Sequence, residues 1–285
     1  MKKALGGLSV AILIFAGCSN GEETEETVES NTYDSNEESD VDEDDTFHDD
    51  EIEEEPDLTE EENEDETADE EEASEELETT HYLAGDHTVQ PLDENLEEKV
   101  VLLTIDDAPD RHGVDMAEAL VELDAGAIFF VNGHFLQSDE GKEELKEIYD
   151  LGFEIGNHTM NHPNMSDLTE DEQYKEIMDL NDLIEEVTGE RPRFYRAPFG
   201  VNTEYTKQLI EEEGMQWMNW TYGYDYNADY MEAKALAEIM VETEFLRNGA
   251  NLLMHDRSFT YEALEDMVNG LREKGYEPLN PKHIE

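Results

Sequence analysis

Basic residues are scarce in this sequence: 17 Lys and Arg stand against 79 Asp and Glu, for a formal net charge of -62 over 285 residues. Nucleic acids and anionic lipid surfaces attract basic proteins, so this shortage excludes a nucleic-acid partner and electrostatic docking to lipid. Such a surface is compatible with life in high salt, where charges are screened, or simply with good hydration. The only cysteine is Cys18, so no internal disulfide can form.

Long apolar runs are also missing, since none reaches the roughly 20 residues of a membrane-spanning helix. The basic start at Lys2 and Lys3 and the short apolar run 4–16 instead fit an export signal. Small residues precede Cys18, and this stretch resembles a bacterial lipobox, with Phe15 where Leu is usual. We therefore expect a signal peptide over 1–17, a lipid on Cys18, and a protein anchored to the cell membrane on the extracytoplasmic face. The alternative is an ordinary signal peptide with an incidental cysteine.

Lys and Arg are absent from residues 21–80, which contain 33 Asp and Glu and almost no aromatics. A segment of this composition cannot bury enough apolar surface to offset its chain entropy. We expect residues 18–80 to be a disordered acidic linker that holds a catalytic domain, 81–285, off the membrane and towards the cell wall. A spacer without a length requirement and a cation-scavenging tail are the alternatives. Nothing in the sequence indicates an oligomer, and a monomer is expected.

From residue 100 onward, strand-like and helix-like blocks alternate, whereas 81–99 reads as a loop leading in. Such alternation predicts a parallel sheet covered by helices, either open or closed into a barrel. Polar residues follow five different strands, and a barrel brings all its strand ends to one face. We therefore expect an α/β fold, a distorted (β/α) barrel of about seven parallel strands. The expected strands are 100–105, 127–131, 153–156, 194–195, 215–219, 251–254 and 276–279. The expected helices are 114–123, 139–149, a long helix capped by Asp167 or Thr169 and ending near 187, 203–213, 233–246 and 261–274.

Two histidines, His158 and His162, stand four residues apart. If the backbone there makes one helical turn, both imidazoles lie on one side and can chelate one divalent ion. The familiar metalloprotease pattern places Glu directly after its first His, but Thr159 stands here, so that reading fails. Asp107, at a strand exit, supplies a third ligand. Two imidazoles and one carboxylate leave room for water and substrate, and zinc lowers the pKa of a bound water to about 7.

Asp106 is then free to accept a proton from that water. Arg196 leads into a rigid turn, and a guanidinium beside Asp106 would keep the carboxylate ionised. His255 follows another apolar strand and is a candidate general acid, with Asp225 as the carboxylate that orients it. Neighbouring Asp residues at a strand exit can also be ordinary turn residues, and surface arginines are usually just solvated.

The residues just described lie in five short segments: 104–107, 157–162, 196–200, 224–226 and 253–255. Taken together, these segments resemble the polysaccharide deacetylases with a NodB-type homology domain, carbohydrate esterase family 4. The resemblance runs from about Lys99 to Tyr276 and includes the stretches 127–131 and 154–158. It implies metal-dependent removal of acetyl groups from amino sugars, with zinc the usual ion and cobalt, manganese or iron as alternatives. It also implies roles for individual residues: Asp106 as catalytic base; Asp107, His158 and His162 as metal ligands; Arg196 holding the base; Asp225 tuning His255, the general acid; Leu253 as a wall of the acetyl pocket; and the backbone N–H of Phe199 as an oxyanion donor.

The sequence departs from the family pattern in two motifs, and in the first of them Ile105 replaces a phenylalanine and is expected to keep the packing. Ala108 replaces a glycine and is expected to ask for a conformation that glycine adopts more cheaply. Tyr226 replaces a tryptophan, with Trp220 nearby, which puts the shape of the substrate pocket in doubt. The resulting hypothesis is a hydrolase that removes N-acetyl groups from N-acetylglucosamine-containing cell-wall polysaccharide, with peptidoglycan as the first candidate. Alternatives are a deacetylase of chitin oligomers or O-acetylated xylan, and a non-catalytic wall-binding lipoprotein on the same fold.

Overall fold

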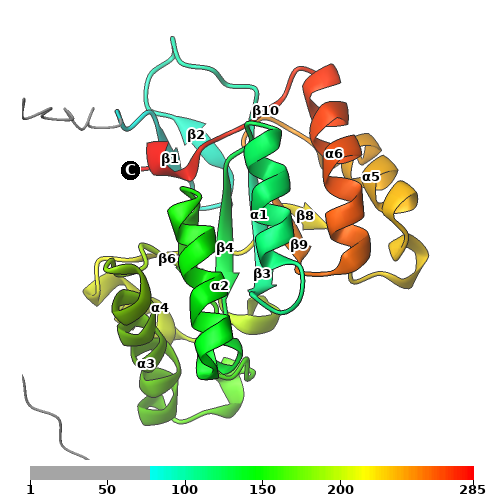
Figure 1. The fold of residues 1–285 in the computed structure, drawn as a ribbon. Coiled ribbons are helices and arrows are strands. Elements are labelled where there is room, and N and C mark those ends of the chain that lie inside the picture. Colours follow the sequence, from blue (N-terminus) through cyan, green and yellow to red (C-terminus); the bar gives the residue numbers. More distant parts are fainter. Residues whose placement is uncertain (1–77) are drawn as a thin grey trace, which may run out of the picture. The chain divides into compact units, whose positions relative to one another are not determined.

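The computed structural model of the protein describes residues 78–285, in which strands and helices alternate (Figure 1). The strands are β1 (His81–Leu83), β2 (Val89–Pro91), β3 (Val100–Ala108), β4 (Ala127–Val131), β5 (Glu154–Asn157), β6 (Phe194–Tyr195), β7 (Gln216–Trp217), β8 (Tyr222–Gly223), β9 (Ala250–His255) and β10 (Glu277–Pro278). The helices are α1 (Gly113–Glu122), α2 (Asp139–Asp150), α3 (Glu170–Thr188), α4 (Glu204–Glu212), α5 (Ala233–Glu242) and α6 (Ser258–Glu273). Short 3-10 turns cover Gly133–Gln137, Met165–Asp167, Pro198–Gly200, Ala228–Tyr230 and Pro281–His283.

One parallel sheet forms the centre of the domain. Its strand order is β7-β6-β5-β4-β3-β9-β8, and β10 pairs with the N-terminal end of β3. The sheet curls into part of a barrel, and within residues 78–285 no strand pairing joins the edge strands β7 and β8. Helices flank the sheet, with α1 and α2 in front of it in Figure 1, α5 and α6 along one side, and α3 and α4 at the lower end of the view. The expected distorted (β/α) barrel is confirmed.

The central strand β3 is buried on both faces, which is why it reads as a continuous apolar run. Val101, Leu103 and Ile105 belong to the large cluster beneath the helices. Val100 and Leu102 point the other way, into a smaller cluster with Phe130 inside the curl of the sheet. Because successive side chains of a strand point to opposite faces of the sheet, β3 supplies apolar side chains to both clusters.

The register of the central strands places polar groups together at one edge. Asp106 on β3 lies opposite His255 on β9, and Val131 on β4 lies opposite Asn157 on β5. Because all these ladders are parallel, their carboxyl ends meet at the same edge. The residues that follow them, including Asp107 and His158, are therefore brought together by the sheet.

Helix boundaries follow local chemistry. Ser138 caps α2 by accepting a hydrogen bond from the Gly141 N–H. Thr169, rather than Asp167, caps α3 in a reciprocal capping box with Glu172, and Gly189 ends this helix in a left-handed conformation with φ 86°. These are the residue types that favour helix termini.

Some expected boundaries were wrong. The segment 81–99, expected to be a loop, contains the antiparallel hairpin β1–β2. Its strands have only three residues each and show no clear alternation, and it is held to the domain by the Val89 N–H, which donates to the Gly249 carbonyl at 2.8 Å. Strand β8 was not expected at all. Helix α5 ends at Glu242 and not near 246, because Thr243 is extended and its Oγ1 accepts a hydrogen bond from the Phe245 N–H.

No helix within residues 78–285 is long and apolar enough to cross a membrane. The expected signal peptide, the lipidation site Cys18 and most of the acidic linker lie outside the described residues.

Candidate metal-dependent active site

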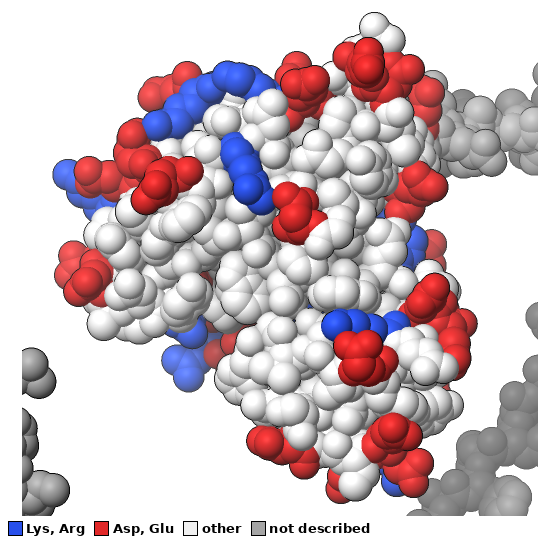
Figure 2. Space-filling model, turned by 180° about the vertical axis from the view of Figure 1, so that it is seen from behind, with Lys and Arg blue, Asp and Glu red and all other residues white. Residues whose placement is uncertain are grey.

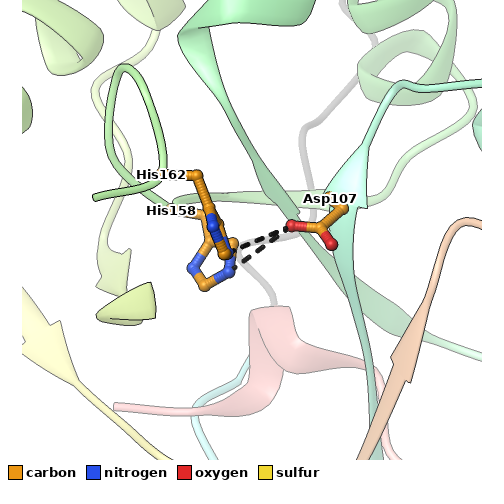
Figure 3. Close-up of side chains that lie close together, drawn as sticks. All are labelled: Asp107, His158 and His162. Atoms are coloured by element: carbon orange, nitrogen blue, oxygen red, sulfur yellow. Dashed lines mark ion pairs between the residues drawn. The ribbon is translucent and has the colours of Figure 1, made fainter. Parts of the chain in front are cut away.

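Three potential metal ligands converge at the carboxyl edge of the sheet. Asp107 comes from the end of β3, and His158 and His162 come from the loop after β5. One ligand atom from each lies within 4.8 Å of the others. The Asp107 Oδ1 atom is 3.5 Å from Nε2 of His162 and 3.7 Å from Nε2 of His158, and Figure 3 shows both imidazoles turned towards this carboxylate. A two-histidine, one-carboxylate set suits a divalent ion such as zinc.

A hydrogen bond orients the His158 ring for binding a metal ion. Its Nδ1 atom lies 2.7 Å from the backbone carbonyl oxygen of Arg196. A carbonyl oxygen can only accept, so Nδ1 carries the proton and Nε2 presents its lone pair towards Asp107. For His162, burial and the nearby His158 lower the pKa against the opposing effect of Asp107, which keeps this imidazole in the neutral form that binds metals.

The backbone around the ligands is strained. Asp107, Thr159, His162 and Phe199 all have positive φ values, of 63°, 70°, 56° and 59°. Residues other than glycine adopt this region at a cost, and such strain gathers at functional sites. The expectation for Ala108 was wrong, because the unusual conformation falls on the ligand Asp107 and not on Ala108.

The segment from His158 to His162 is a tight loop and not a helical turn. Its form is fixed locally: Asn157 Oδ1 accepts a hydrogen bond from the Thr159 N–H at 2.8 Å, and Thr159 Oγ1 accepts one from the His162 N–H at 3.1 Å. The two imidazole rings still come together, with centroids 4.9 Å apart. The i,i+4 spacing thus gives the expected convergence by a different backbone route.

Beside the candidate metal site, Asp106 is paired with Arg196. Both side chains are almost completely buried, and Nη1 of Arg196 donates to Asp106 Oδ1 at 2.7 Å. Burial alone would raise the pKa of Asp106, but the charge of Arg196, with those of His158 and His255, outweighs it and lowers the pKa below its usual value. Burial lowers the pKa of Arg196 while Asp106 opposes this, and the guanidinium keeps its proton because its ordinary pKa is so high. The pair therefore carries an ionised carboxylate at neutral pH.

Residues that the sequence did not single out hold this arginine. Nη1 of Arg196 also donates to Thr104 Oγ1 at 2.7 Å, and Nη2 donates to Asn251 Oδ1 at 3.1 Å. The guanidinium lies 4.3 Å from the centroid of the Phe130 ring. Thr104 and Asn251 lie inside apolar strands. A single polar residue within such a strand is the sequence feature that could have pointed to their role. Asn132 is similar, since its amide donates to the His158 carbonyl.

A second charged pair faces the same site. His255 Nδ1 lies 2.8 Å from Asp225 Oδ1, and the His255 backbone N–H donates to Asp225 Oδ2. Thr260 Oγ1 also donates to Oδ2, at 3.2 Å. Burial lowers the pKa of His255, but the hydrogen bond to Asp225 and the charges of Asp225, Asp106 and Asp107 raise it by more, so the net pKa is above its ordinary value. The imidazole is therefore disposed to hold a proton that it can donate.

If the protein releases acetate, as the family resemblance implies, Asp225→Asn is expected to lower that release by about 10- to 100-fold and to move the alkaline limb of the kcat/KM profile to lower pH. The reason is that the amide removes the charge that raises the pKa of His255. Measurement of kcat/KM across pH 5–10 checks this. Asp229→Asn, an exposed position nearby, serves as the control. An Asp225→Asn profile that superimposes on the wild-type profile would contradict the assigned partnership.

The three potential ligands, Asp106 and His255 line one cavity of about 470 Å³, whereas their partners Arg196 and Asp225 are fully buried and do not line it. Phe199 and Tyr226 stand at its rim, 64% and 53% exposed, while Leu253 is buried in its wall. Two lining residues, Trp220 and Arg257, were not predicted as site residues. The cavity is lined by Asp106, Asp107, His158, His162, Phe199, Trp220, Tyr226, Leu253, His255 and Arg257.

Comparison with known proteins identifies the family. The sequence matches the family model described as polysaccharide deacetylase over residues 93–218. It is 30% identical over 186 residues to a peptidoglycan-N-acetylglucosamine deacetylase of Bacillus cereus, which covers 63% of this chain and 84% of the relative. It is 31% identical over 153 residues to the uncharacterized protein YlxY of Bacillus subtilis, covering 53% of this chain and 46% of YlxY. The chain belongs to the polysaccharide deacetylases, with a NodB-type domain of carbohydrate esterase family 4.

Among solved structures, wild-type BA3943 from Bacillus anthracis, a family 4 pseudoenzyme, is 31% identical with a TM-score of 0.58 over 64% of this chain and 63% of that chain. A BA3943 mutant described as having restored enzymatic activity is 33% identical, with the same TM-score, over 64% and 65%. This chain therefore spans slightly less than two thirds of BA3943 and about half of YlxY. Since the fold is shared with a pseudoenzyme, activity has to be argued from the residues in the cavity.

Proposed function

We propose that this protein is a metal-dependent hydrolase that removes N-acetyl groups from N-acetylglucosamine residues of cell-wall polysaccharide. One observation carries the proposal: a single cavity holds a metal-competent triad, an arginine-paired carboxylate and a carboxylate-paired imidazole. Hydrolysis of an amide needs an electrophilic centre, a base and an acid on different sides of one carbonyl.

The ligand set Asp107, His158 and His162 fits one divalent ion, with zinc the first candidate and cobalt, manganese or iron as alternatives. When bound, the ion would polarise the amide carbonyl and make a coordinated water more acidic. The neutral state of His162 and the fixed tautomer of His158 prepare the site for such an ion.

The remaining steps are carried by the protein's own groups. Asp106 accepts a proton from the attacking water, and Arg196 keeps it ionised and aimed. The backbone N–H of Phe199 is assigned to stabilise the oxygen of the tetrahedral intermediate. His255 donates its proton to the departing amine nitrogen as the C–N bond breaks, and Leu253 packs against the acetyl methyl group. Water and amide thus give acetate and a glycan that carries one ammonium group.

Peptidoglycan is the proposed substrate because the Bacillus cereus relative is named for that activity. The exposed rings of Phe199 and Tyr226 at the rim offer surfaces against which sugar rings can pack. Chitin oligomers and O-acetylated xylan are the alternative substrates.

Acetate assays on purified cell wall, chitin oligomers and acetylated xylan test the proposal, each with zinc, cobalt and manganese supplied in turn. We expect acetate from the wall preparation, loss of activity after chelation and dialysis, and recovery when the ion returns. Full activity after exhaustive chelation would exclude the mechanism, and acetate from xylan alone would exclude the proposed substrate.

A non-catalytic wall-binding protein is the second candidate, and the likeness to BA3943 favours it. It predicts that a group needed for the reaction is absent or misplaced. The base, the acid and all three ligands are present in one cavity here, which favours catalysis. Wall binding without acetate release from the metal-loaded protein would decide for the second candidate.

We propose further that the protein is a monomer, anchored through a lipid on Cys18 and facing the cell wall, with residues 18–80 joining the anchor to the catalytic domain at 81–285. The support is the sequence pattern around Cys18 and the acidic composition that follows it. Growth with labelled fatty acid tests the anchor, and an unlabelled protein would refute it.

A further inference from the structure

Arg257 lies in the wall of the cavity, two residues after His255, which ends β9. It is half-buried and is the N-cap residue of α6. Within residues 78–285 its side chain makes one hydrogen bond, from Nη1 to the backbone carbonyl oxygen of Asp225 at 3.0 Å. One edge of the guanidinium is thereby fixed, and the remaining N–H groups are left for another acceptor.

No carboxylate of the described chain neutralises this arginine. All seven arginines of the protein lie within residues 78–285, and six of them have a carboxylate oxygen within 4.0 Å. On the face shown in Figure 2, too, basic side chains lie against acidic ones. Among the residues that the structure describes, Arg257 is the exception.

The acidic residue that contacts Arg257, Asp225, and the one that precedes it in the chain, Asp256, are already engaged. Both carboxylate oxygens of Asp225 are taken by His255 and Thr260, and Asp256 accepts the backbone N–H groups of residues 110–112. The first turn of α6 contains no acidic residue. Asp106 is paired with Arg196. A positive group that lines the cavity and has no carboxylate partner within residues 78–285 is therefore available to the substrate.

We propose that Arg257 binds a carboxylate on the glycan, so that the enzyme favours acidic over neutral acetamido sugars. This inference rests on the proposed deacetylase function and adds a substrate class to it. A guanidinium binds a carboxylate through paired N–H donors, and such charge-assisted bonds are stronger than neutral ones. Two glycan chemistries supply a carboxylate on the ring that adjoins an N-acetylglucosamine residue: the lactyl ether of N-acetylmuramic acid, and a uronic acid.

Four probes test the proposal: a disaccharide of N-acetylglucosamine and N-acetylmuramic acid, the methyl ester of its lactyl group, a disaccharide of N-acetylglucosamine and glucuronic acid, and the methyl ester of its uronic acid. We expect the wild type to prefer one free acid over its neutral counterpart by about tenfold or more in kcat/KM. Arg257→Gln should remove this ratio, and Arg257→Lys should retain part of it because the charge persists. Whichever acid shows the preference identifies the source of the carboxylate.

The matched control is Arg247→Gln, which removes an exposed arginine paired with Asp86 and should leave the ratio unchanged. Binding to the Asp106→Asn variant, measured by calorimetry with the same probes, repeats the comparison without turnover. Equal affinity for each acid and its own ester, before and after Arg257→Gln, overturns the role of Arg257, while acetate release leaves the deacetylase function standing. Discrimination in binding with no acetate from any glycan overturns the deacetylase function and keeps Arg257.

Discussion

Asp107→Ala is expected to abolish measurable acetate release and to weaken divalent-ion binding by more than about 100-fold. Loss of a hydrogen-bond partner of a metal ligand typically costs about 10- to 100-fold, so loss of a ligand should cost more. The Asp107 carboxylate is the group that faces both imidazoles, as Figure 3 shows. Calorimetric titration with zinc and cobalt measures the affinity, and acetate release measures the activity.

Asp115→Ala is the matched control, because it removes an aspartate of α1 whose side chain is 51% exposed and pairs with His112 at the surface. It should bind metal and release acetate as the wild type does. If Asp107→Ala kept its activity, or if the wild type bound no divalent ion in the micromolar range, the triad would not be the metal site. Asp106 would then have no metal-activated water from which to accept a proton, and the proposed mechanism would be wrong.

The sequence predicts much of the fold, because parallel strands buried on both faces produce apolar runs that are easy to read. Strands β4 and β6 begin and end where expected, and Ser138, Thr169 and Gly189 mark helix ends through residue types that favour those positions. The short strands were harder. β8 contains only Tyr222 and Gly223, and it is a strand because it pairs with β9, which is information from elsewhere in the chain.

The candidate site, like the fold, contains residues that the sequence predicted and residues that it did not predict. Its central residues were predicted because each follows an apolar run, and the register of β3 against β9 brings Asp106 opposite His255. The groups that hold Arg196 were not predicted, because Thr104 and Asn251 look like ordinary strand residues until the strands are placed side by side. The left-handed conformation of Asp107 was not predicted either, because no feature of the neighbouring sequence indicates it.

The charges in and beside the cavity explain why Asp106 is paired with a buried arginine. The folded chain is strongly acidic, yet it buries a cation, Arg196, completely beside a carboxylate. Taking both charges out of water is costly, and their attraction has to compensate for that cost. The arrangement keeps Asp106 ionised inside a cavity that also holds an imidazole with a raised pKa, which is the combination that separate base and acid roles demand.

Arg196→Met is therefore expected to destabilise the metal-free protein by about 3–5 kcal/mol at neutral pH, because it leaves the buried Asp106 charge without its partner. In the native protein the pKa of Asp106 is lowered, so the pair contributes stability above the unfolded pKa and loses it as the pH falls through the folded one. Without Arg196, burial raises the pKa of Asp106, and the carboxylate can be protonated in mild acid. The deficit relative to wild type should thus be larger at pH 7 than at pH 5.

Urea unfolding at both pH values measures the deficit, with chelator present so that no ion compensates the charge. Arg191→Met is the control: this arginine is partly exposed, its ion pairs lie at the surface, and its loss should cost no more than about 1 kcal/mol. Combining Arg196→Met with Asp106→Asn should recover a large part of the stability, since the uncompensated charge is then gone, while acetate release stays lost because the base is gone too. Equal deficits at both pH values, with no recovery in the double variant, would mean that Arg196 stabilises the protein through packing against Phe130 rather than through charge.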